Sequence, residues 1–447
     1  MLQNVVSGNF RGKFHSISAS KRTTECEQCF SVLGGLSAEV LSLNSRPARP
    51  YILSSLLSAM DLSTSSSLWA YGSVWLFFSL LVYFKFSHSD MVLTPALLVY
   101  FFLLVIFEWF CHLYLPIILG IVLLSSACWY VLSIASPRRM LPVAGKAVFI
   151  TGCDSGFGKA AAHKMDKMGF RVIASVLDLQ SPGAKDLKKR CSDRLTIIQM
   201  DLTKAEDIKR AYQIIREKTA DTGLWALVNN AGYCAHFGDA ELSLMSTYRG
   251  CMEVNFFGTL EMTKTLLPML RSSKGRIVTI SSPAGEHSFP FLAAYGSSKA
   301  ALGRVMDTFR HELMPWGVKV SVIQPGSYKT GAHDNKTHWE NQHQKLLTSL
   351  PSELLQDYGE EYICETQNMF LNYGNTACSD FSPVLDSITD AILSESPKVK
   401  YYAGKQLWLL YFIGIYLPHC ISDSFFKSIF LKGKTMPRAL QKQKQTE

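Results

Sequence analysis

The amino-acid sequence predicts an α/β fold, in which a doubly wound parallel sheet follows transmembrane helices near the N-terminus. Between residues 147 and 325, short apolar runs alternate with segments of helical periodicity, a pattern typical of a parallel sheet with helices on both faces. The runs are continuously apolar, as expected of strands buried on both sides. Upstream, three long apolar stretches contain no Asp, Glu, Lys or Arg. Charged residues make up only 18% of the chain, against about 25% in an average soluble domain.

Residues 1–67 are predicted to be an irregular N-terminal extension. The first 60 residues are rich in serine and contain six basic residues against three acidic ones. Three readings are open for this segment. It is a disordered tail, a targeting leader, or sequence that precedes a natural start at Met60, where a membrane protein begins directly.

Residues 68–135 are predicted to form a membrane anchor of about three spans. The uncharged stretches cover residues 68–84, 91–107 and 109–135. A helix needs roughly 20 apolar residues, within a range of about 17 to 25, to cross the hydrocarbon layer. The third stretch is therefore long enough, and the first two lie at the lower limit. Buried core helices are the alternative, but these stretches have no polar face to present to water.

The basic residues around the anchor predict its orientation. Lys85 follows the first stretch and Arg138-Arg139 follow the third, whereas the turn predicted at Glu108–His112 has no Lys or Arg. The positive-inside rule then places everything after residue 136 in the cytosol, with the N-terminus across the membrane. A long basic extension fits that far side poorly, and a start at Met60 removes the conflict. The glycosylation sequon at Asn335 is accordingly expected to carry no glycan.

Charge and cysteine content exclude other classes of function. The net charge is +9, but the basic residues are dispersed without interleaved aromatic residues, so no nucleic-acid partner is predicted. The eleven cysteines show no disulfide spacing, which suits a reducing compartment. Cys26 and Cys29 form a lone CxxC without a second pair of ligands, so no metal site is predicted.

Residues 146–335 are predicted to form a dinucleotide-binding catalytic domain. Its expected strands are Ala147–Ile150, Val172–Val176, Leu195–Ile198, Ala226–Val228, Ile277–Ile280 and Val318–Ile323. The first strand leads into a glycine-rich turn that contains Gly152, Ser155, Gly156, Phe157 and Gly158. Glycines at this point permit a tight turn and a close approach of the backbone to a pyrophosphate at the helix N-terminus. The strand–turn–helix context favours this Rossmann-type interpretation over an ordinary loop.

Two acidic residues at strand ends predict the cofactor. Asp178 follows the second strand, where a carboxylate accepts hydrogen bonds from the ribose hydroxyls of NAD and repels the extra phosphate of NADP. No Arg lies immediately around it, so NAD is the predicted cofactor. A surface aspartate without this role is the alternative. Asp201 ends the third strand and is expected near the adenine ring.

The catalytic prediction rests on Ser282, Tyr295 and Lys299. A Tyr and a Lys four residues apart share one face of a helix, which brings the ammonium close to the phenol. A free phenol has a pKa near 10 and is a poor base, but a neighbouring cation, helped by the positive charge of the nicotinamide, is expected to lower that pKa toward the working range. Ser282 is expected to hold the substrate hydroxyl. Asn255 is expected to order a water that connects Lys299 to solvent.

These motifs occur in the order that is typical of one enzyme family. With Asn229-Asn230-Ala231-Gly232 and Pro325-Gly326, residues 146–335 resemble the short-chain dehydrogenase/reductase family. Within that family, residues 65–440 are most similar to the type 2 11β-hydroxysteroid dehydrogenases. The stretches that carry this resemblance are Ile150–Lys159, Cys251–Gly258, Pro315–Lys319, Leu354–Gly359 and Met436–Leu440.

The resemblance implies an enzyme of the endoplasmic reticulum membrane with its catalytic domain facing the cytosol. It implies use of NAD to oxidise the 11β-hydroxyl of glucocorticoids to the 11-keto form. The implied cofactor-binding residues are Gly152, Ser155, Gly156, Phe157, Gly158, Asp178, Asp201, Asn229, Ala231, Gly232, Tyr295, Lys299, Pro325 and Gly326. Oxidation of a 17β-hydroxysteroid or a retinol is the nearer alternative, and an inactive membrane-bound steroid-binding protein is the more distant one.

The substrate side is predicted less specifically. Phe289 and Pro290 lie just before Tyr295 and, with Ser282, are expected to contact an apolar steroid, with plain core packing as the alternative. The segment from Tyr328 to about Leu347 is expected to form a substrate lid. Residues 336–447 are expected to comprise most of this lid, a C-terminal extension and a solvated basic tail. The apolar run Leu407–Leu417 is too short to span a membrane. It lies in the interface, packs near the pocket or pairs subunits, so a homodimer is one possible assembly.

Overall fold

The structure is a computed structural model that describes residues 69–85, 95–134, 139–234, 236–330, 336–404, 407–430 and 435–446. The predicted extension at residues 1–67 and the sequon residue Asn335 lie outside the described residues.

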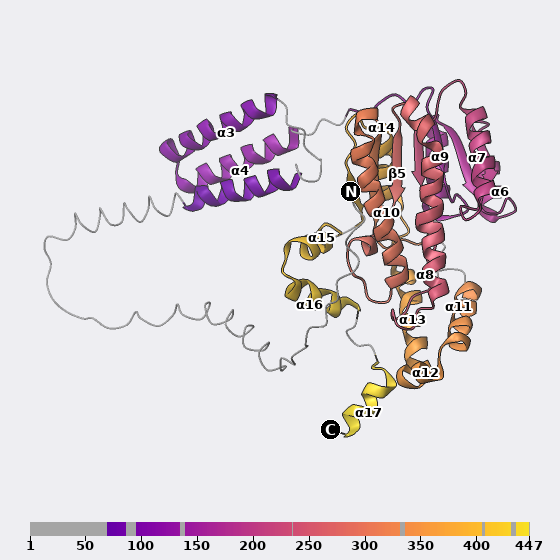
Figure 1. The fold of residues 1–447 in the computed structure, drawn as a ribbon. Helices are drawn as coiled ribbons and strands as arrows, with labels where there is room; N and C mark the ends of the chain where they lie inside the picture. The colour runs from indigo at the N-terminus through magenta and orange to yellow at the C-terminus, as the bar shows by residue number, and fades with distance from the viewer. Residues whose placement is uncertain are drawn as a thin grey trace, which may run out of the picture. The chain divides into compact units, whose positions relative to one another are not determined.

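The described part of the chain begins with three apolar helices (Figure 1). They cover residues 69–85, α3 at Pro95–Tyr114 and α4 at Ile117–Ile134. The segment Leu97–Tyr114 is long and apolar enough to cross a membrane, whereas Ile117–Ser133 is apolar but shorter. The turn predicted at residues 108–112 is wrong, because α3 continues through it. The break comes instead at Pro116, whose ring cannot continue the preceding helix and suits the start of α4.

Within these three helices, a small core coexists with a large uncovered apolar surface. Tyr71, Phe78, Leu104 and Leu124 are buried against one another's helices. Many large apolar side chains point outward and are exposed. They include Trp69, Phe77, Phe102, Ile118 and Trp129. Exposed apolar surface on this scale needs a covering environment other than water.

The catalytic part contains a seven-stranded sheet in the order β3-β2-β1-β4-β5-β6-β7, with all neighbouring strands parallel. The strands are β1 Ala147–Ile150, β2 Arg171–Val176, β3 Leu195–Gln199, β4 Ala226–Asn229, β5 Arg276–Ile280, β6 Lys319–Pro325 and β7 Lys400–Ala403. The six predicted strands are confirmed within a few residues. The prediction missed β7, which is short and contains two tyrosines and a lysine.

Helices cover both faces of this sheet and enclose two apolar cores (Figure 1). One face is covered by α5 Gly156–Met168, α6 Pro182–Arg190 and α14 Ser382–Leu393, and the other by α7 Ala205–Lys218, α9 Thr259–Ser272 and α10 Ala293–Glu312. Side chains along β1 alternate between the two cores. Val148 and Ile150 belong to the first and Phe149 to the second. The doubly wound architecture predicted from the sequence is confirmed.

The remaining elements complete the catalytic part. They are α8 Met245–Met252, a π-helical turn at Glu253–Gly258, 3₁₀ turns at Pro283–Gly285 and Met314–Trp316, α11 Lys336–Ser349, α12 Ser352–Tyr358, α13 Glu360–Thr376, α15 Leu407–Tyr416, α16 His419–Phe430 and α17 Arg438–Thr446.

Most residues in the described part of the predicted basic tail, 435–446, are exposed, Arg438 and Lys442 among them, but this segment also contacts other helices. Helix α17 packs on α12, and the backbone N–H of Thr435 donates to a carboxylate oxygen of Glu365 at 3.3 Å. The guanidinium of Arg438 lies against Gly359, where a Cβ atom would be only 3.1 Å from Nε. Gly359 has φ +79°, a conformation that favours glycine. Because glycine has no side chain, it also leaves the space that Arg438 fills. This contact depends on folding and could not be seen in the charge pattern of the tail.

Candidate active site

The glycine-rich turn after β1 is built so that no side chain fits at its three glycines. Gly152 has φ +69°, and a Cβ there would lie 2.8 Å from the Cα of Ala231. A Cβ on Gly158 would lie 2.3 Å from the carbonyl oxygen of Gly152. Gly156 has φ +54°, and a Cβ there would lie 3.0 Å from the Cβ of Thr330. The turn therefore presents bare backbone at the carboxyl end of β1, which is the edge where such sheets bind nucleotides.

The N-terminus of α5 suits an anion. Its N-cap residue, Ser155, is exposed, and the hydroxyl makes no capping hydrogen bond within the helix. Unpaired backbone N–H groups and the helix dipole favour a phosphate at this position. The Phe157 ring instead packs at about 5 Å, centroid to centroid, from the rings of Tyr328 and Phe381. A contribution of Phe157 to cofactor binding would thus come from its backbone.

Asp178 lies exposed after β2, where the ribose was predicted to bind. One carboxylate oxygen accepts the backbone N–H of Gln180 at 2.8 Å. Asp154 was not predicted to contribute to the site. Its two carboxylate oxygens each accept the backbone N–H of Leu177 at 3.0 Å. Asp154 thereby ties the glycine-rich turn to the loop that carries Asp178. The position of an acidic residue inside a glycine-rich turn was the signal in the sequence that could have indicated this role.

The segment after β4 is joined to the same turn. Asn230 donates from Nδ2 to the carbonyl oxygens of Thr151 and Gly152, at 2.8 and 2.9 Å. The Thr151 hydroxyl accepts the backbone N–H groups of Asn230 and Ala231, both at 3.0 Å. The buried Asn229 side chain points elsewhere and donates to Thr263 and Thr279. Asn230 is therefore the residue that positions the turn, although only its neighbours were predicted as cofactor ligands.

The remaining predicted cofactor residues lie at the ends of β3 and β6. The Asp201 carboxylate accepts the backbone N–H and the hydroxyl of Thr203, at 3.0 and 2.7 Å, at the start of the loop to α7. Pro325 is the last residue of β6, and Gly326 follows it and donates from its backbone to the carbonyl of Ala403 at 2.9 Å. All these strand ends are carboxyl ends of parallel strands and so belong to one edge of the sheet.

Tyr295 and Ser282 are brought together in front of this edge. Tyr295 lies in the first turn of α10, and Ser282 precedes the 3₁₀ turn that follows β5. Their side chains are hydrogen bonded. The Ser282 hydroxyl also accepts the backbone N–H of Ala284 at 3.2 Å, which fixes its direction. The fold therefore brings Ser282 and Tyr295 together, and the predicted contact of Ser282 with the substrate hydroxyl stays a prediction.

Lys299 lies one helical turn beyond Tyr295 but does not lower the pKa of the phenol in the protein alone. Its ammonium donates to the carbonyl of Ile280 at 3.0 Å and lies 5.9 Å from the centre of the Tyr295 ring. Burial lowers the pKa of Lys299 to about 8. Burial also raises the pKa of Tyr295, and the hydrogen bond with Ser282 opposes this only in part. Loss of water penalises the phenolate, so Lys299 alone does not produce the predicted shift, and a lowered pKa in the presence of a positively charged nicotinamide stays a prediction.

Asn255 is fully buried in the π-helical turn between α8 and α9. Its Oδ1 accepts the backbone N–H of Tyr233 at 2.7 Å, and its Nδ2 donates to the carbonyl of Tyr233 at 2.8 Å and to Ser298 at 2.9 Å. Single π-turns of this kind are frequent at functional sites. Gly232 lies beside both side chains. A Cβ atom at Gly232 would lie 3.4 Å from Nζ of Lys299 and 3.5 Å from Oδ1 of Asn255. A water between these two side chains stays a prediction.

Two thiols near the catalytic pair were also missed. Cys234 and Cys251 are both close enough to Tyr295 and Lys299 to affect the pKa of each. Burial raises the pKa of Cys234 itself to about 12, so the thiol stays protonated. Neutral thiols at this position add polarisable, weakly polar surface to the site.

Aromatic residues pack around the loop that precedes Tyr295. The Phe289 ring meets Phe426 of α16 at 5.6 Å, and His287 meets Tyr411 of α15 at 4.6 Å. The apolar run in α15 therefore packs beside the loop that carries the predicted substrate residues Phe289 and Pro290. Phe291, next in this loop, is buried with φ +70°, a strained conformation for an aromatic residue.

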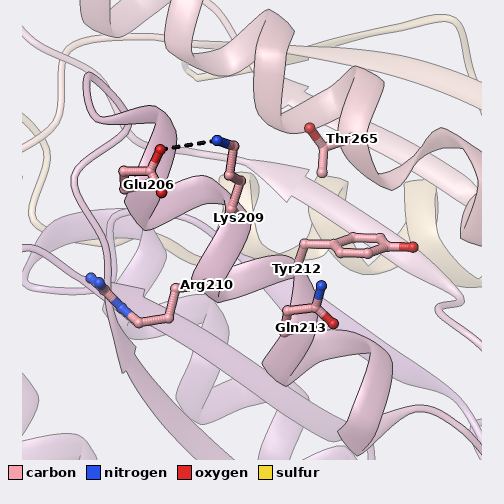
Figure 2. Close-up of a pocket in the computed structure, with 6 residues that line it drawn as sticks. All are labelled: Glu206, Lys209, Arg210, Tyr212, Gln213 and Thr265. Atoms are coloured by element: carbon pink, nitrogen blue, oxygen red, sulfur yellow. Dashed lines mark hydrogen bonds and ion pairs between the residues drawn. The ribbon is translucent and has the colours of Figure 1, made fainter.

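An open groove of about 420 Å³ lies elsewhere, between α7 and α9 (Figure 2). The side chains that line it are those of Glu206, Lys209, Arg210, Tyr212, Gln213 and Thr265. The ammonium of Lys209 pairs with Glu206 at 2.9 Å, and Arg210 pairs with Asp207 at 2.7 Å. None of the predicted site residues lines this groove, and its cations are neutralised by neighbours.

The fold and the site define an oxidoreductase that uses a nicotinamide dinucleotide. Residues 146–341 match the family described as short chain dehydrogenase, and the chain belongs to this family. The chain is 51% identical over 374 residues to "11-beta-hydroxysteroid dehydrogenase type 2" of Bos taurus, which covers 83% of this chain and 92% of that protein. It is 45% identical over 331 residues to "17-beta-hydroxysteroid dehydrogenase type 2" of Homo sapiens, covering 74% and 86%. Among solved structures, a short-chain dehydrogenase from Streptomyces avermitilis gives a TM-score of 0.49 at 22% identity, covering 67% of this chain and 97% of that one.

Proposed function

We propose that the protein oxidises the 11β-hydroxyl of glucocorticoids to the 11-keto form with NAD as the cofactor. The similarity to 11-beta-hydroxysteroid dehydrogenase type 2, which extends over 374 residues and well beyond the catalytic motifs, carries this proposal. The site supports it in three ways. A bare glycine-rich turn and an exposed Ser155 suit the pyrophosphate, an exposed Asp178 suits the ribose, and aromatic side chains around Phe289 suit an apolar substrate.

In the proposed reaction, Tyr295 accepts the proton of the substrate hydroxyl. Ser282, already hydrogen bonded to Tyr295, orients that hydroxyl. A nicotinamide dinucleotide held by the glycine-rich turn and Asp178 would supply the acceptor for the hydride on the carbon that bears this hydroxyl. Lys299 supplies the positive charge near the phenol, and the rigidly held Asn255 is proposed to order the water through which the proton leaves.

The decisive experiment is incubation of the full-length protein with NAD and, in turn, cortisol, estradiol and retinol. Formation of NADH and the 11-keto steroid with cortisol, at the highest kcat/KM of the three, is expected. The 17β-hydroxysteroids are the second candidate substrates, because the chain is also 45% identical to a 17-beta-hydroxysteroid dehydrogenase. Faster turnover of estradiol would therefore replace the first assignment. No NADH with any of them would leave only a steroid-binding role.

Cofactor choice provides a second test. Asp178→Ser is expected to narrow the preference for NAD over NADP, because it removes a carboxylate that repels the 2′-phosphate. The ratio of kcat/KM with the two cofactors measures this preference. Asp193→Ser is a matched control, since Asp193 is equally exposed but precedes β3 at the opposite edge of the sheet. Equal use of NAD and NADP by the unsubstituted enzyme would refute the role of Asp178.

We also propose that the protein resides in the endoplasmic reticulum membrane, with residues 68–135 as the anchor and the catalytic domain in the cytosol. The apolar helix at Leu97–Tyr114 and the exposed apolar side chains around it support an anchor. Lys85 and Arg138-Arg139 support the orientation, because basic residues favour the cytosolic side.

This orientation predicts that Asn335 carries no glycan when the protein is made in cells. Protease added to intact microsomes is expected to cleave the chain after Arg139. The mobility of the protein before and after glycosidase treatment checks the first point, with Asn335→Gln as the control. A glycosidase-sensitive shift that disappears in Asn335→Gln would place the active site in the lumen, away from cytosolic NAD.

A further inference from the structure

A small cavity lies between the loop after β4 and the helices α11 and α13. It is lined by His236, Phe237, Trp339, Gln342, His343, Ile363, Gln367 and Phe370. Its volume of about 10 Å³ has room for roughly a single water molecule. Most of the lining is apolar or aromatic, and Gln367 is already engaged with the carbonyl of Trp339 at 2.9 Å and with His343.

His236 differs from the other polar residues of this cavity. Its Nε2 atom is buried and has no hydrogen-bond partner among the described residues. The ring occupies the space beside Gly238, where a Cβ would lie 2.3 Å from Nε2. Burial, reinforced by the neighbouring His343, lowers the pKa of His236 to about 4, so the imidazole is neutral at physiological pH. A buried nitrogen without a partner is costly, and in a native structure it requires an explanation.

The chain connects His236 directly to the reaction site. Cys234, which affects the pKa of Tyr295, donates from its thiol to the carbonyl of His236 at 3.8 Å. Phe237 continues the connection through its ring, which lies 5.4 Å from Phe291 in the loop before Tyr295 and stacks at 4.7 Å on Phe370 of α13. An aromatic wall therefore extends from the catalytic loop to the cavity at His236.

We propose that His236 determines substrate specificity by hydrogen bonding, through Nε2, to an oxygen atom of the steroid remote from the hydroxyl that reacts. This inference rests on the proposed function. Ligand sites combine apolar walls with a few placed polar groups, and here the wall ends at one polar atom that lacks a partner. A neutral imidazole can donate to a carbonyl or accept from a hydroxyl, depending on its tautomer. The cavity must widen by movement of side chains when a ring system enters.

The experiment compares His236→Leu and His236→Gln with the unsubstituted full-length enzyme. Two matched pairs of 11β-hydroxysteroids serve as substrates, one differing only in the oxygen on C3 and the other only in the oxygens of the C17 side chain. The quantity measured is the ratio of kcat/KM within each pair. This ratio does not depend on the amount of folded enzyme, so partial misfolding of a variant leaves it valid. The expected ratio for one pair is roughly 5- to 10-fold in favour of the oxygenated steroid, the range for a neutral hydrogen bond.

In His236→Leu this preference is expected to disappear through slower turnover of the oxygenated steroid alone. His236→Gln, which retains a donor and an acceptor, is expected to keep part of it. A preference that survives in His236→Leu, or equal losses for both members of each pair, would overturn the inference and leave the proposed function intact. Absence of turnover of all four steroids by the unsubstituted enzyme would overturn the proposed function, and the inference with it.

Discussion

Tyr295→Phe is expected to lower turnover by at least ~10²-fold, the lower end of the range for general acid–base catalysis. The substitution keeps the ring and its packing in α10 but removes the oxygen that is proposed to accept the substrate proton. It also leaves Ser282 without the phenol hydroxyl to which it is hydrogen bonded. NAD binding should largely survive, because the glycine-rich turn and Asp178 lie on other strand ends.

Initial rates of NADH formation and a titration of NADH fluorescence measure the two effects separately. Tyr212→Phe is the matched control, since Tyr212 lines the groove between α7 and α9, and none of the predicted site residues is among the residues that line it (Figure 2). Its turnover should equal that of the unsubstituted enzyme. If Tyr295→Phe retained more than half of the original turnover, the assignment of the catalytic base would be wrong.

Gly158→Ala is expected to weaken NAD binding roughly 10-fold or more. The new methyl group would lie 2.3 Å from the carbonyl oxygen of Gly152 and 2.4 Å from Nδ2 of Asn230. The first atom belongs to the turn that is proposed to hold the pyrophosphate and the second is hydrogen bonded to it, so the backbone there must move. Overpacking of this kind costs about 1–3 kcal/mol, and about 1.4 kcal/mol corresponds to a tenfold change in affinity.

The control for this variant is Gly303→Ala. Gly303 also lies within a helix, but a Cβ there would meet no atom within 4 Å. Alanine at that position should leave NAD binding unchanged and raise the thermal unfolding temperature slightly, because glycine disfavours helix interiors. NADH titration and thermal unfolding of both variants check the pair. Unchanged NADH affinity in Gly158→Ala would mean that the turn does not bind the pyrophosphate.

The sheet and the glycine-rich turn could be predicted because their signals are local. A strand buried on both faces requires a continuous apolar run, and β1 and the first three residues of β4 have that form. The three glycines of the turn are equally local, since each is required by backbone geometry. The strand β7 lacks such a run and was missed.

The details of the site could not be predicted because they depend on residues that meet only after folding. Burial decides the pKa of Tyr295, and the partner of Lys299 is a carbonyl on β5, 19 residues away. Asp154 and His236 are ordinary polar residues in the sequence. Asp154 matters because its carboxylate accepts the backbone N–H of Leu177. His236 matters because its buried Nε2 atom has no hydrogen-bond partner among the described residues. The docking of α17 on α12 is likewise a tertiary contact.

The buried ammonium of Lys299 implies a trade-off between activity and stability. A pKa of about 8 instead of 10.5 corresponds to roughly 3 kcal/mol, because each tenfold change in proton affinity is worth about 1.4 kcal/mol. The unfolded chain binds this proton more tightly than the folded one. The penalty is therefore present in full below pH 8 and fades as the pH rises from about 8 to 10.5. At neutral pH the resting protein thus carries a destabilising charge that the proposed catalytic role of Lys299 requires, and the remainder of the fold must supply the stability that this residue removes.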